Sequence, residues 1–550
     1  MSRFDYKKYR PFAFAPALPD RTWPDKIINK APIWVSVDLR DGNQALIDPM
    51  TIEQKLRYFQ LLVDCGFKEI EIGFPAASQI EYDFTRLLIE GGHIPDDVTI
   101  QVLVQAREHL IDRTFESLRG VKRAIVHVYN STSRVQREKV YEKNLADITA
   151  IAVAGATLLQ ERATHYPESE WIFEYSPESF SQTEPDFAVA VCEAVCQVWQ
   201  PWAGRKVILN LPHTVEACTP NLYADQIEYF CRHLSCREHV TISVHTHNDR
   251  GCAVAASELA VMAGADRVEG TLLGNGERTG NMDIMIMAMN LYSQGIDPGL
   301  DFSRMNDIVR IVSECNNLPV HPRHPYIGEL VFTAFSGSHQ DAIKKSLEKP
   351  QNGIWDIAYL PIDPLDIGRS YQDVVRINSQ SGKGGVAYIL ARDYGLNVPR
   401  WLQIDFAQKV QAESERTQKE LSSQDIITLF ENSYLHDSPL HLDDYAIRRI
   451  ERQEHSLEAS LTRTDGRGIS LKGHGGGAMS AFIDALQQHS GKTISVANYA
   501  EHAMSKSTDA QAVAYVQLMI DDELRTGIAY SQDTVSAMLR ATLVAAGQIL

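Results

Sequence analysis

The sequence predicts an α/β protein built on a closed (β/α)8 TIM barrel. Between residues 33 and 295, eight short apolar runs alternate with amphipathic stretches of helical periodicity. Eight such units in succession close into a barrel of parallel strands, which carries its chemistry at the C-terminal ends of the strands. A doubly wound open sheet is the alternative, and it is disfavoured because no GxGxxG turn follows the first apolar run.

The individual elements follow from periodicity and from helix-start signals. Thr51-Ile52-Glu53-Gln54 is a capping-box start for the first helix. Strands are predicted at 33–38, 69–74, 98–104, 123–129, 171–175, 206–211, 240–247 and 267–273. Helical patterns between them include 51–65, 142–161, 185–199, 221–234 and 252–263.

The composition describes a large acidic protein. A chain of 550 residues is too long for one hydrophobic core and indicates two or three domains. Its net charge of −18 argues against nucleic acid and anionic membrane surfaces as partners. The start lacks an apolar signal-peptide core, no stretch is apolar enough to span a membrane, and the eight cysteines include no CxxC pair. We therefore expect a reduced, cytoplasmic protein.

The regular alternation ends near residue 320, where His321-Pro322-Arg323-His324-Pro325 interrupts periodic structure. We expect the barrel domain, with an N-terminal extension, to occupy residues 1–325. Linker subdomains that mix short helices with loops and cover the active site are expected over 326–430. A small α+β domain is expected over 431–550.

The last of these domains contains a weak internal repeat. Residues 458–471 and 513–530 each fit strand–turn–strand, and helical patterns follow at 478–488 and 533–545. Two β-β-α units would form a regulatory domain, because nothing in them looks catalytic. Ligand sensing or dimer formation suits such a domain, and plain structural duplication is the alternative.

Three polar segments follow the first, seventh and eighth predicted strands. They are VDLRDGNQ (37–44), VHTHND (244–249) and GNGERTGN (274–281). In a closed barrel the eighth strand pairs with the first, so these three strands are neighbours although they lie far apart in sequence. We therefore expect the three segments to converge on one rim of the barrel.

Two histidines in the second segment favour a metal site. His245 and His247 are two residues apart, so on a strand both side chains point to the same face. A polar strand end with one histidine on a backbone carbonyl is the alternative. Asn248 and Asp249 favour the metal, because they make the loop too polar for ordinary packing.

The first and third segments add oxygen ligands and a cation. Asp41-Gly42 alone would be a simple turn and Asn281 alone a helix cap, but beside the histidines both become candidate ligands. Arg40 supplies a forked cation for a carboxylate or an oxyanion. Mixed nitrogen and oxygen ligands suit Mg²⁺, Mn²⁺, Co²⁺ or Zn²⁺, with open positions that imply polarisation of a substrate carbonyl.

Together, DLRDGNQ, HTHND and GNGERTGN resemble the metal-dependent Claisen-condensing enzymes that join acetyl-CoA to a 2-oxo acid. The chain is similar to the 2-isopropylmalate synthase family in particular. That similarity rests on HVYNSTS (127–133), EYSPESFSQTEPDFA (174–188), LPHTVE (211–216), FSGSHQDAI (335–343) and NSQSGKGG (378–385). It runs through residues 20–400 and weakens toward the C-terminal end.

The resemblance implies a role for each of a set of residues. The metal ligands would be Asp41, His245, His247 and Asn281. The catalytic groups would be Arg40, which stabilises the alkoxide formed on attack, His339 as the base, Tyr371 as its assistant, and Glu178. The 2-oxo acid pocket would contain His127, Ser176, Thr214 and Glu178. The acyl-CoA side would be formed by Glu277, Gly274 and Gly276.

The resemblance also implies an activity, cofactors and partners. The chain would condense acetyl-CoA with 2-oxoisovalerate to 2-isopropylmalate and CoA, the first committed step of leucine biosynthesis. It would need a divalent metal ion, Mg²⁺ in preference to Mn²⁺, Co²⁺ or Zn²⁺. A homodimer is implied, because relatives take the segment around His339 from the partner subunit. Leucine feedback is implied too, although KGHGGG (472–477) stands where leucine-sensing relatives often carry a Gly-Asn-Gly-Pro type loop.

Three alternatives remain at this point. A sister synthase would use pyruvate or 2-oxoglutarate, giving a citramalate or homocitrate synthase, and the latter needs a cation for a distal carboxylate that has no clear candidate. A metal-binding sensor without turnover would be indicated by the loss of a ligand or of Arg40, and none is lost. A lyase on the same barrel is disfavoured by the long chain beyond residue 320.

Overall fold

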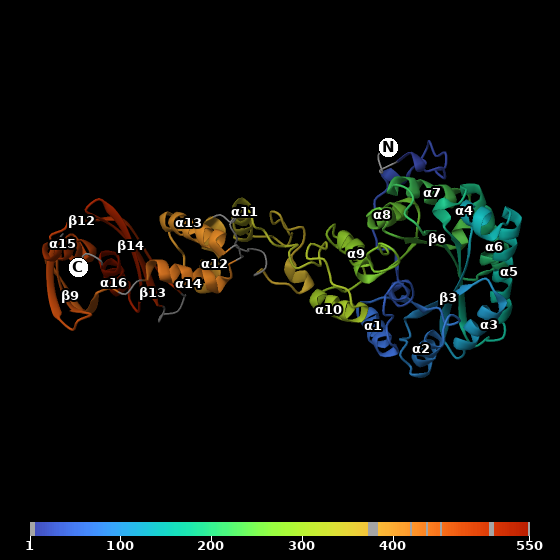
Figure 1. Ribbon diagram of the computed structural model, residues 1–550, viewed down its shortest axis with the longest axis horizontal. Coiled ribbons are helices and arrows are strands. Elements are labelled where there is room, and N and C mark those ends of the chain that lie inside the picture. The colour runs from blue at the N-terminus through green and yellow to red at the C-terminus, as the bar shows by residue number, and fades with distance from the viewer. Residues whose placement is uncertain are drawn as a thin grey trace. The chain divides into compact units, whose positions relative to one another are not determined.

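The computed structural model describes residues 6–371, 383–417, 421–435, 438–451, 454–504 and 511–547. The chain divides into two compact units (Figure 1). The first comprises Met1–Val331 with Leu365–Arg369, and the second Phe332–Pro364 with Ser370–Leu550. The three-part division at residues 325 and 430 stays a prediction.

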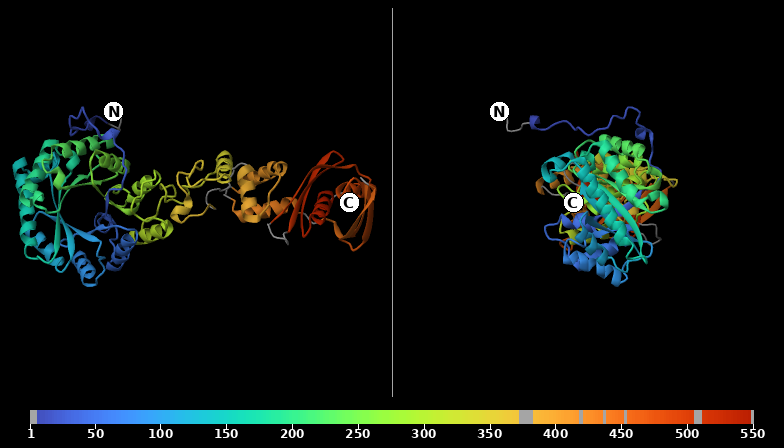
Figure 2. Two further views of the ribbon diagram at one scale, coloured as in Figure 1. Left: turned by 180° about the vertical axis from the view of Figure 1, so that it is seen from behind. Right: turned by 90° about the vertical axis from the view of Figure 1, so that its right-hand side faces the viewer.

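A closed barrel of eight parallel strands confirms the predicted fold class, and its ring of strands inside a ring of helices is visible in Figure 2. Closure occurs where Ile33 pairs with Arg267 and Ser36 with Gly270. The strands are β1 (Ile33–Ser36), β2 (Glu69–Gly73), β3 (Thr99–Gln105), β4 (Arg123–Ser131), β5 (Glu170–Glu178), β6 (Val207–His213), β7 (Thr241–Thr246) and β8 (Arg267–Gly270).

Helices surround the ring of strands on the outside of the barrel (Figure 2). The capping box at Thr51 and Gln54 is present, with each side chain bonded to the other residue's backbone N–H. The helices of the first unit are α1 (Ile52–Asp64), α2 (Gln79–Glu90), α3 (Glu108–Ser117), α4 (Arg134–Gln136), α5 (Leu145–Ala163), α6 (Pro185–Trp199), α7 (Pro220–His233), α8 (Ala253–Ala263), α9 (Ile284–Tyr292) and α10 (Met305–Asn316).

Much of the barrel interior is charged. The guanidinium of Arg267 lies 2.6 Å from Glu69, 2.8 Å from Glu269 and 3.4 Å from Glu174, and the side chain of Arg267 is fully buried. Buried charges are costly unless they are paired, and here each carboxylate shares the same cation. An apolar cluster of Ile125, Ile172 and Ile208 fills another part of the interior.

The second unit begins with helices and ends with two similar sheet–helix repeats. Its helices are α11 (Gly337–Leu347), α12 (Lys383–Tyr394), α13 (Arg400–Thr417) and α14 (Ser423–Tyr434). The repeats are β9 (Leu440–Glu451), β10 (Glu454–Arg463), β11 (Gly468–Gly475) and α15 (Ala478–Ser490), then β12 (Ile494–Ala503), β13 (Ala512–Ile520), β14 (Glu523–Ser531) and α16 (Thr534–Ala546). Most of the segment 378–385 lies outside the described residues.

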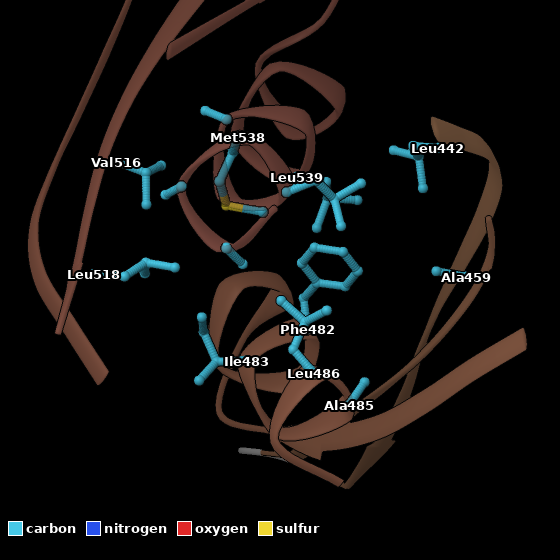
Figure 3. Close-up of a cluster of buried hydrophobic side chains, with 14 of the residues drawn as sticks. Leu442, Ala459, Phe482, Ile483, Ala485, Leu486, Val516, Leu518, Met538 and Leu539 are labelled. Carbon is cyan, nitrogen blue, oxygen red and sulfur yellow. The ribbon is translucent and has the colours of Figure 1, made fainter. Parts of the chain in front are cut away.

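Each repeat therefore contains three strands instead of the two that the sequence predicts. The extra strands, β9 and β12, both lie at a sheet edge, because the strand orders are β11-β10-β9 and β12-β13-β14. Edge strands carry polar and charged side chains that hide the alternating pattern. Figure 3 shows the shared core, in which Phe482 and Leu486 of α15 face Met538 and Leu539 of α16.

Within the described residues, no helix has both the length and the hydropathy that a membrane span needs.

Candidate active site

The four side chains that the sequence marks as metal ligands lie together. Nε2 of His245 is 3.1 Å from Oδ2 of Asp41 and 3.3 Å from Nε2 of His247. Nε2 of His247 is 3.6 Å from the same Asp41 oxygen. Nδ2 of Asn281 lies 2.8 Å from Oδ2 of Asp41 and 3.3 Å from Nε2 of His245. All four side chains are buried.

A tight helical turn after β1 places Asp41. The turn spans Asp38–Gly42, and the carbonyl of Val37 accepts the backbone N–H groups of both Asp41 and Gly42. Asp38 fastens the turn to the loop after β8, because its carboxylate accepts the N–H of Leu272 at 3.1 Å. Burial raises the pKa of Asp38 to about 7, although its hydrogen bonds act in the opposite direction.

Backbone pairing places the other three ligands. His247 and Asn281 face each other across an isolated β-bridge, and the N–H of Asn281 donates to the carbonyl of Gly274. Gly280 has a φ of +101°, and a Cβ there would lie 2.0 Å from the oxygen of Gly274. Only glycine allows this close approach, so the GNGERTGN segment needs its glycines to bring Asn281 beside the histidines.

Gly276 serves the same packing. A Cβ on Gly276 would lie 1.9 Å from Oδ1 of Asn281, and Gly274 adopts a φ of +68°. Both glycines therefore shape the loop around Asn281. Glu277, the third residue predicted for the acyl-CoA side, lines the cavity described below.

The donor set fits a divalent cation. A carboxylate oxygen and two imidazole nitrogens, all buried, approach one another closely enough to share one ion. Oδ1 of Asn281 has no hydrogen-bond partner in the described part of the chain, and exchange of its two amide atoms would present that oxygen to the ion. Burial and the charge of the adjacent His245 lower the pKa of His247 to about 3. Burial would also lower the pKa of His245, but hydrogen bonds to Asp41 and Glu269 raise it to about 9; ligation requires both imidazoles in the neutral form.

A second cluster of potential ligands is occupied by an amide. Glu71, His127 and Glu269 lie close enough to share an ion. Nε2 of Gln101 lies among them, at 2.9 Å from Oε2 of Glu71, 3.4 Å from Nδ1 of His127 and 3.2 Å from Oε1 of Glu269. The Gln101 amide thus donates where a cation would otherwise sit, and this cluster supports the site above it.

Arg40 is held on two sides. Its Nε donates to Oε1 of Glu71 at 2.5 Å, and its Nη1 lies 3.2 Å from Oδ1 of Asp41. Burial would lower the pKa of Arg40, but the two carboxylates keep the guanidinium charged. Arg40 therefore presents a fixed positive fork to the cavity beside the candidate metal centre.

A cavity of about 310 Å³ opens beside these groups. Nε2 of His127 lies 2.7 Å from Oγ of Ser176, Ser131 donates to Glu178, and Oγ1 of Thr214 accepts the N–H of Ser179 at 2.9 Å. The cavity is lined by Arg40, Asp41, Gln44, Leu103, His127, Tyr129, Ser176, Glu178, Asn210, Pro212, Thr214, His245, His247, Glu277 and Arg278.

Sequence reasoning missed several of these groups. Tyr129, Asn210 and Arg278 line the cavity, while Glu71 and Glu269 support it from below. For the strand residues the sequence indicated only an inward position, because a polar side chain in an apolar run faces the barrel interior, whereas Arg278 lies within the GNGERTGN segment itself.

The predicted base and its assistant lie in the second unit. The ring of His339, on α11, stacks on Tyr359 with centroids 4.0 Å apart. The hydroxyl of Tyr371 donates to Oδ1 of Asp363 at 2.9 Å. Their catalytic roles stay predictions, since the cavity residues all belong to the first unit.

Fold and site together define a barrel enzyme of the HMGL-like class. Residues 31–312 match the HMGL-like family model. Residues 329–391 match a domain described as "Alpha-isopropylmalate synthase, post-catalytic domain-like", and residues 420–550 match the "LeuA allosteric (dimerisation) domain".

Full-length relatives narrow this class. The 2-isopropylmalate synthases of Alcanivorax borkumensis and Rhodospirillum rubrum are each 54% identical to this chain, over 99% of it and 98% of the relative. The 2-isopropylmalate synthase of Clostridium acetobutylicum is 52% identical over 96% of both chains. The chain belongs to the 2-isopropylmalate synthase family, as its motifs indicated, and is a transferase of leucine biosynthesis.

Proposed function

We propose that the chain condenses acetyl-CoA with 2-oxoisovalerate and hydrolyses the resulting thioester, which yields 2-isopropylmalate and CoA. The observation that carries the proposal is the convergence of Asp41, His245, His247 and Asn281 beside Arg40, next to a cavity that all of these except Asn281 line. Membership of the family supports the choice of reaction, and the cavity supports its location beside the candidate metal ligands.

Asp41, His245, His247 and Asn281 would hold a divalent metal ion, for which we propose Mg²⁺. When bound, such an ion supplies Lewis-acid polarisation of the keto group of the 2-oxo acid. Arg40 lies beside the ligand Asp41 and stabilises the negative charge that develops on the keto oxygen.

A base must take a proton from the acetyl methyl group, a weak carbon acid, and must be positioned to do so. We propose His339 for this role, with Tyr371 assisting, and Glu178 as a further catalytic group. The electron pair of the C–H bond then forms the new bond to the keto carbon of the 2-oxo acid, while the C=O π pair moves to the keto oxygen, which takes up a proton to become the product hydroxyl. Water cleaves the thioester in the last step and releases CoA.

The pocket residues favour a small 2-oxo acid. His127, Ser176 and Thr214 would contact it, and the cavity volume of about 310 Å³ suits a compact substrate. Arg278 is the other guanidinium among the described lining residues, and it is engaged by Asp249 through Nε at 2.7 Å and Nη2 at 3.1 Å. A longer dicarboxylate such as 2-oxoglutarate therefore lacks a cation for its distal end.

The acyl-CoA side of the site is proposed at Glu277, Gly274 and Gly276. Gln44 and Glu277 both line the cavity, and Nε2 of Gln44 lies 3.4 Å from Oε1 of Glu277, which supports an acyl-CoA subsite at this loop.

We further propose a cytoplasmic homodimer with a barrel domain over 1–325, linker subdomains over 326–430 and a regulatory domain over 431–550 that binds leucine. The match to the LeuA allosteric (dimerisation) domain supports the last of these roles. The eight cysteines all fall in the described ranges and form no disulfide there, in keeping with a reducing compartment.

The test is a panel of 2-oxo acids assayed with acetyl-CoA by release of the CoA thiol. 2-Oxoisovalerate should give the highest kcat/KM, because each missing methylene of 2-oxobutyrate or pyruvate removes ~1–3 kcal/mol of transition-state binding. 2-Oxoglutarate serves as the charged control. A higher kcat/KM for pyruvate would make the chain a citramalate synthase instead.

A further inference from the structure

Glu269, on β8, is a buried carboxylate that touches one candidate metal ligand. Its Oε2 lies 2.8 Å from Nδ1 of His245, the ring nitrogen on the side away from Asp41 and His247. The Glu269 side chain is fully buried and does not line the cavity. It is therefore placed to act on His245 and not on a substrate.

The neighbours of Glu269 settle which partner donates. Arg267 donates to Oε1 at 2.8 Å and Gln101 to the same oxygen at 3.2 Å, while Nδ2 of Asn210 donates to Oε2 at 3.3 Å. With its oxygens accepting from donors on every side, Glu269 has no place for a proton of its own.

The orientation of Gln101 is fixed in turn. Nη2 of Arg267 donates to its Oε1, so its amide nitrogen must face Glu269 and Glu71. Because the guanidinium of Arg267 can only donate, it fixes which atom of Gln101 accepts and which donates in this hydrogen-bond network. The network gives the Glu269 carboxylate a single orientation.

We propose that Glu269 is a positioning residue of the metal centre: its carboxylate holds the Nδ1–H of His245 and turns the Nε2 lone pair toward Asp41 and His247. The inference rests on the metal site of the proposed function. An outer carboxylate of this kind fixes the imidazole tautomer and ring angle and makes the ligand nitrogen more basic.

The matched control is Glu174, one of the carboxylates around Arg267. It is equally buried and lies 3.4 Å from Nη2 of Arg267, but no hydrogen bond or ion pair joins it to His245. Glu174→Gln therefore removes a buried carboxyl group from the surroundings of Arg267 without removing a contact of His245. Glu269→Gln instead puts an amide nitrogen against donors, whichever way it turns.

The experiment measures binding of Mn²⁺ to the full-length, chelator-treated protein by the electron paramagnetic resonance of free Mn²⁺. Glu269→Gln should weaken binding ~10–100-fold, the usual cost of losing an outer-shell partner, and Glu174→Gln should leave it unchanged. Native affinity in folded Glu269→Gln, or equal losses in both variants, overturns the inference. Failure of the wild type to bind Mn²⁺, or native affinity in Asp41→Ala, overturns the metal site itself.

A second measurement needs no variant and covers a Glu269→Gln chain that does not fold. In protein labelled with ¹⁵N-histidine and loaded with Zn²⁺, His245 should carry its proton on Nδ1, in slow exchange with water because the bond to Glu269 is buried. A proton on Nε2 of His245, or an Nδ1 proton in fast exchange, contradicts the inference whatever the variants do.

Discussion

At the scale of single residues, ion pairs and hydrogen bonds to buried carboxylates hold the side chains of the candidate site in position. Arg40 is positioned by Glu71 and Asp41, and His245 by Glu269. Arg40 and Asp41 could be predicted because they follow a strand in a polar loop. Glu71 and Glu269 could not be ranked from sequence alone, since a lone carboxylate within a strand does not reveal which loop residue it contacts.

Replacement of Arg40 by lysine tests the oxyanion role. Arg40 uses Nε on Glu71 and Nη1 on Asp41, and this fork leaves one fixed orientation that an ammonium cannot reproduce. We expect Arg40→Lys to lower kcat ~10²–10³-fold, with a smaller change in the KM for 2-oxoisovalerate. Steady-state thiol release measures both constants, and a near-native kcat would contradict the role.

At the scale of elements, the barrel could be predicted and the C-terminal sheets only in part. Each apolar run of the barrel is a buried strand, and the helix pattern and capping box were unambiguous, so the predicted ranges agree with the structure to within a few residues. The edge strands β9 and β12 were missed because solvent-facing side chains obscure alternation. Barrel closure predicted that the loops after β1, β7 and β8 converge, but it did not predict the side-chain contacts among the strand residues that face the barrel interior.

Buried His213, at the end of β6, should make the stability of the barrel depend on pH. Burial lowers the pKa of His213 to about 3, and its Nε2 accepts the N–H of Ala217 at 3.0 Å. The unfolded chain, with a histidine pKa of about 6.5, takes up a proton in acid that the folded chain refuses. The contribution of neutral His213 to the free energy of unfolding is therefore complete above about pH 6.5. It decreases as the pH falls, by ~2 kcal/mol at pH 5.

The control for this prediction is His213→Gln, which keeps an acceptor and removes the titration. Thermal unfolding of the barrel transition should shift less between pH 7 and pH 5 in the variant than in the wild type. Parallel shifts in the two proteins would show that His213 does not contribute.

At the scale of the whole molecule, the groups proposed for catalysis are divided between two units. The candidate metal centre and cavity belong to the first, and His339 and Tyr371 belong to the second. The match to a dimerisation domain makes a shared site between subunits a natural proposal. Sequence could locate both sets of residues but not the subunit that supplies each.

Mixed dimers of His339→Ala and Asp41→Ala subunits test the sharing. Each variant alone should be inactive, one without the base and the other without a ligand. In a mixed dimer one of the two sites combines intact groups from both chains, and the other carries both substitutions. Co-expressed, differently tagged and purified heterodimers should therefore regain up to about half of the wild-type activity per dimer. No recovery in verified heterodimers would place the base in the same chain as the metal centre.

Leucine should act on the C-terminal repeats and not on the barrel. We expect leucine to inhibit the full-length enzyme through a coupling of ~1–3 kcal/mol, while valine serves as the matched control. Hydrogen exchange should show leucine-dependent protection within residues 440–547. Protection confined to the barrel, or no response to millimolar leucine, would leave this domain a structural or dimer-forming role.

The central claim is metal-dependent condensation at Asp41, His245, His247 and Asn281. The most direct measurement is the rate of CoA release from acetyl-CoA and 2-oxoisovalerate by chelator-treated enzyme, titrated with Mg²⁺. The account predicts no release without the ion, full recovery in the wild type, and no recovery in Asp41→Ala at the same concentrations. Native turnover by the metal-free wild type, or equal recovery in Asp41→Ala, would contradict it.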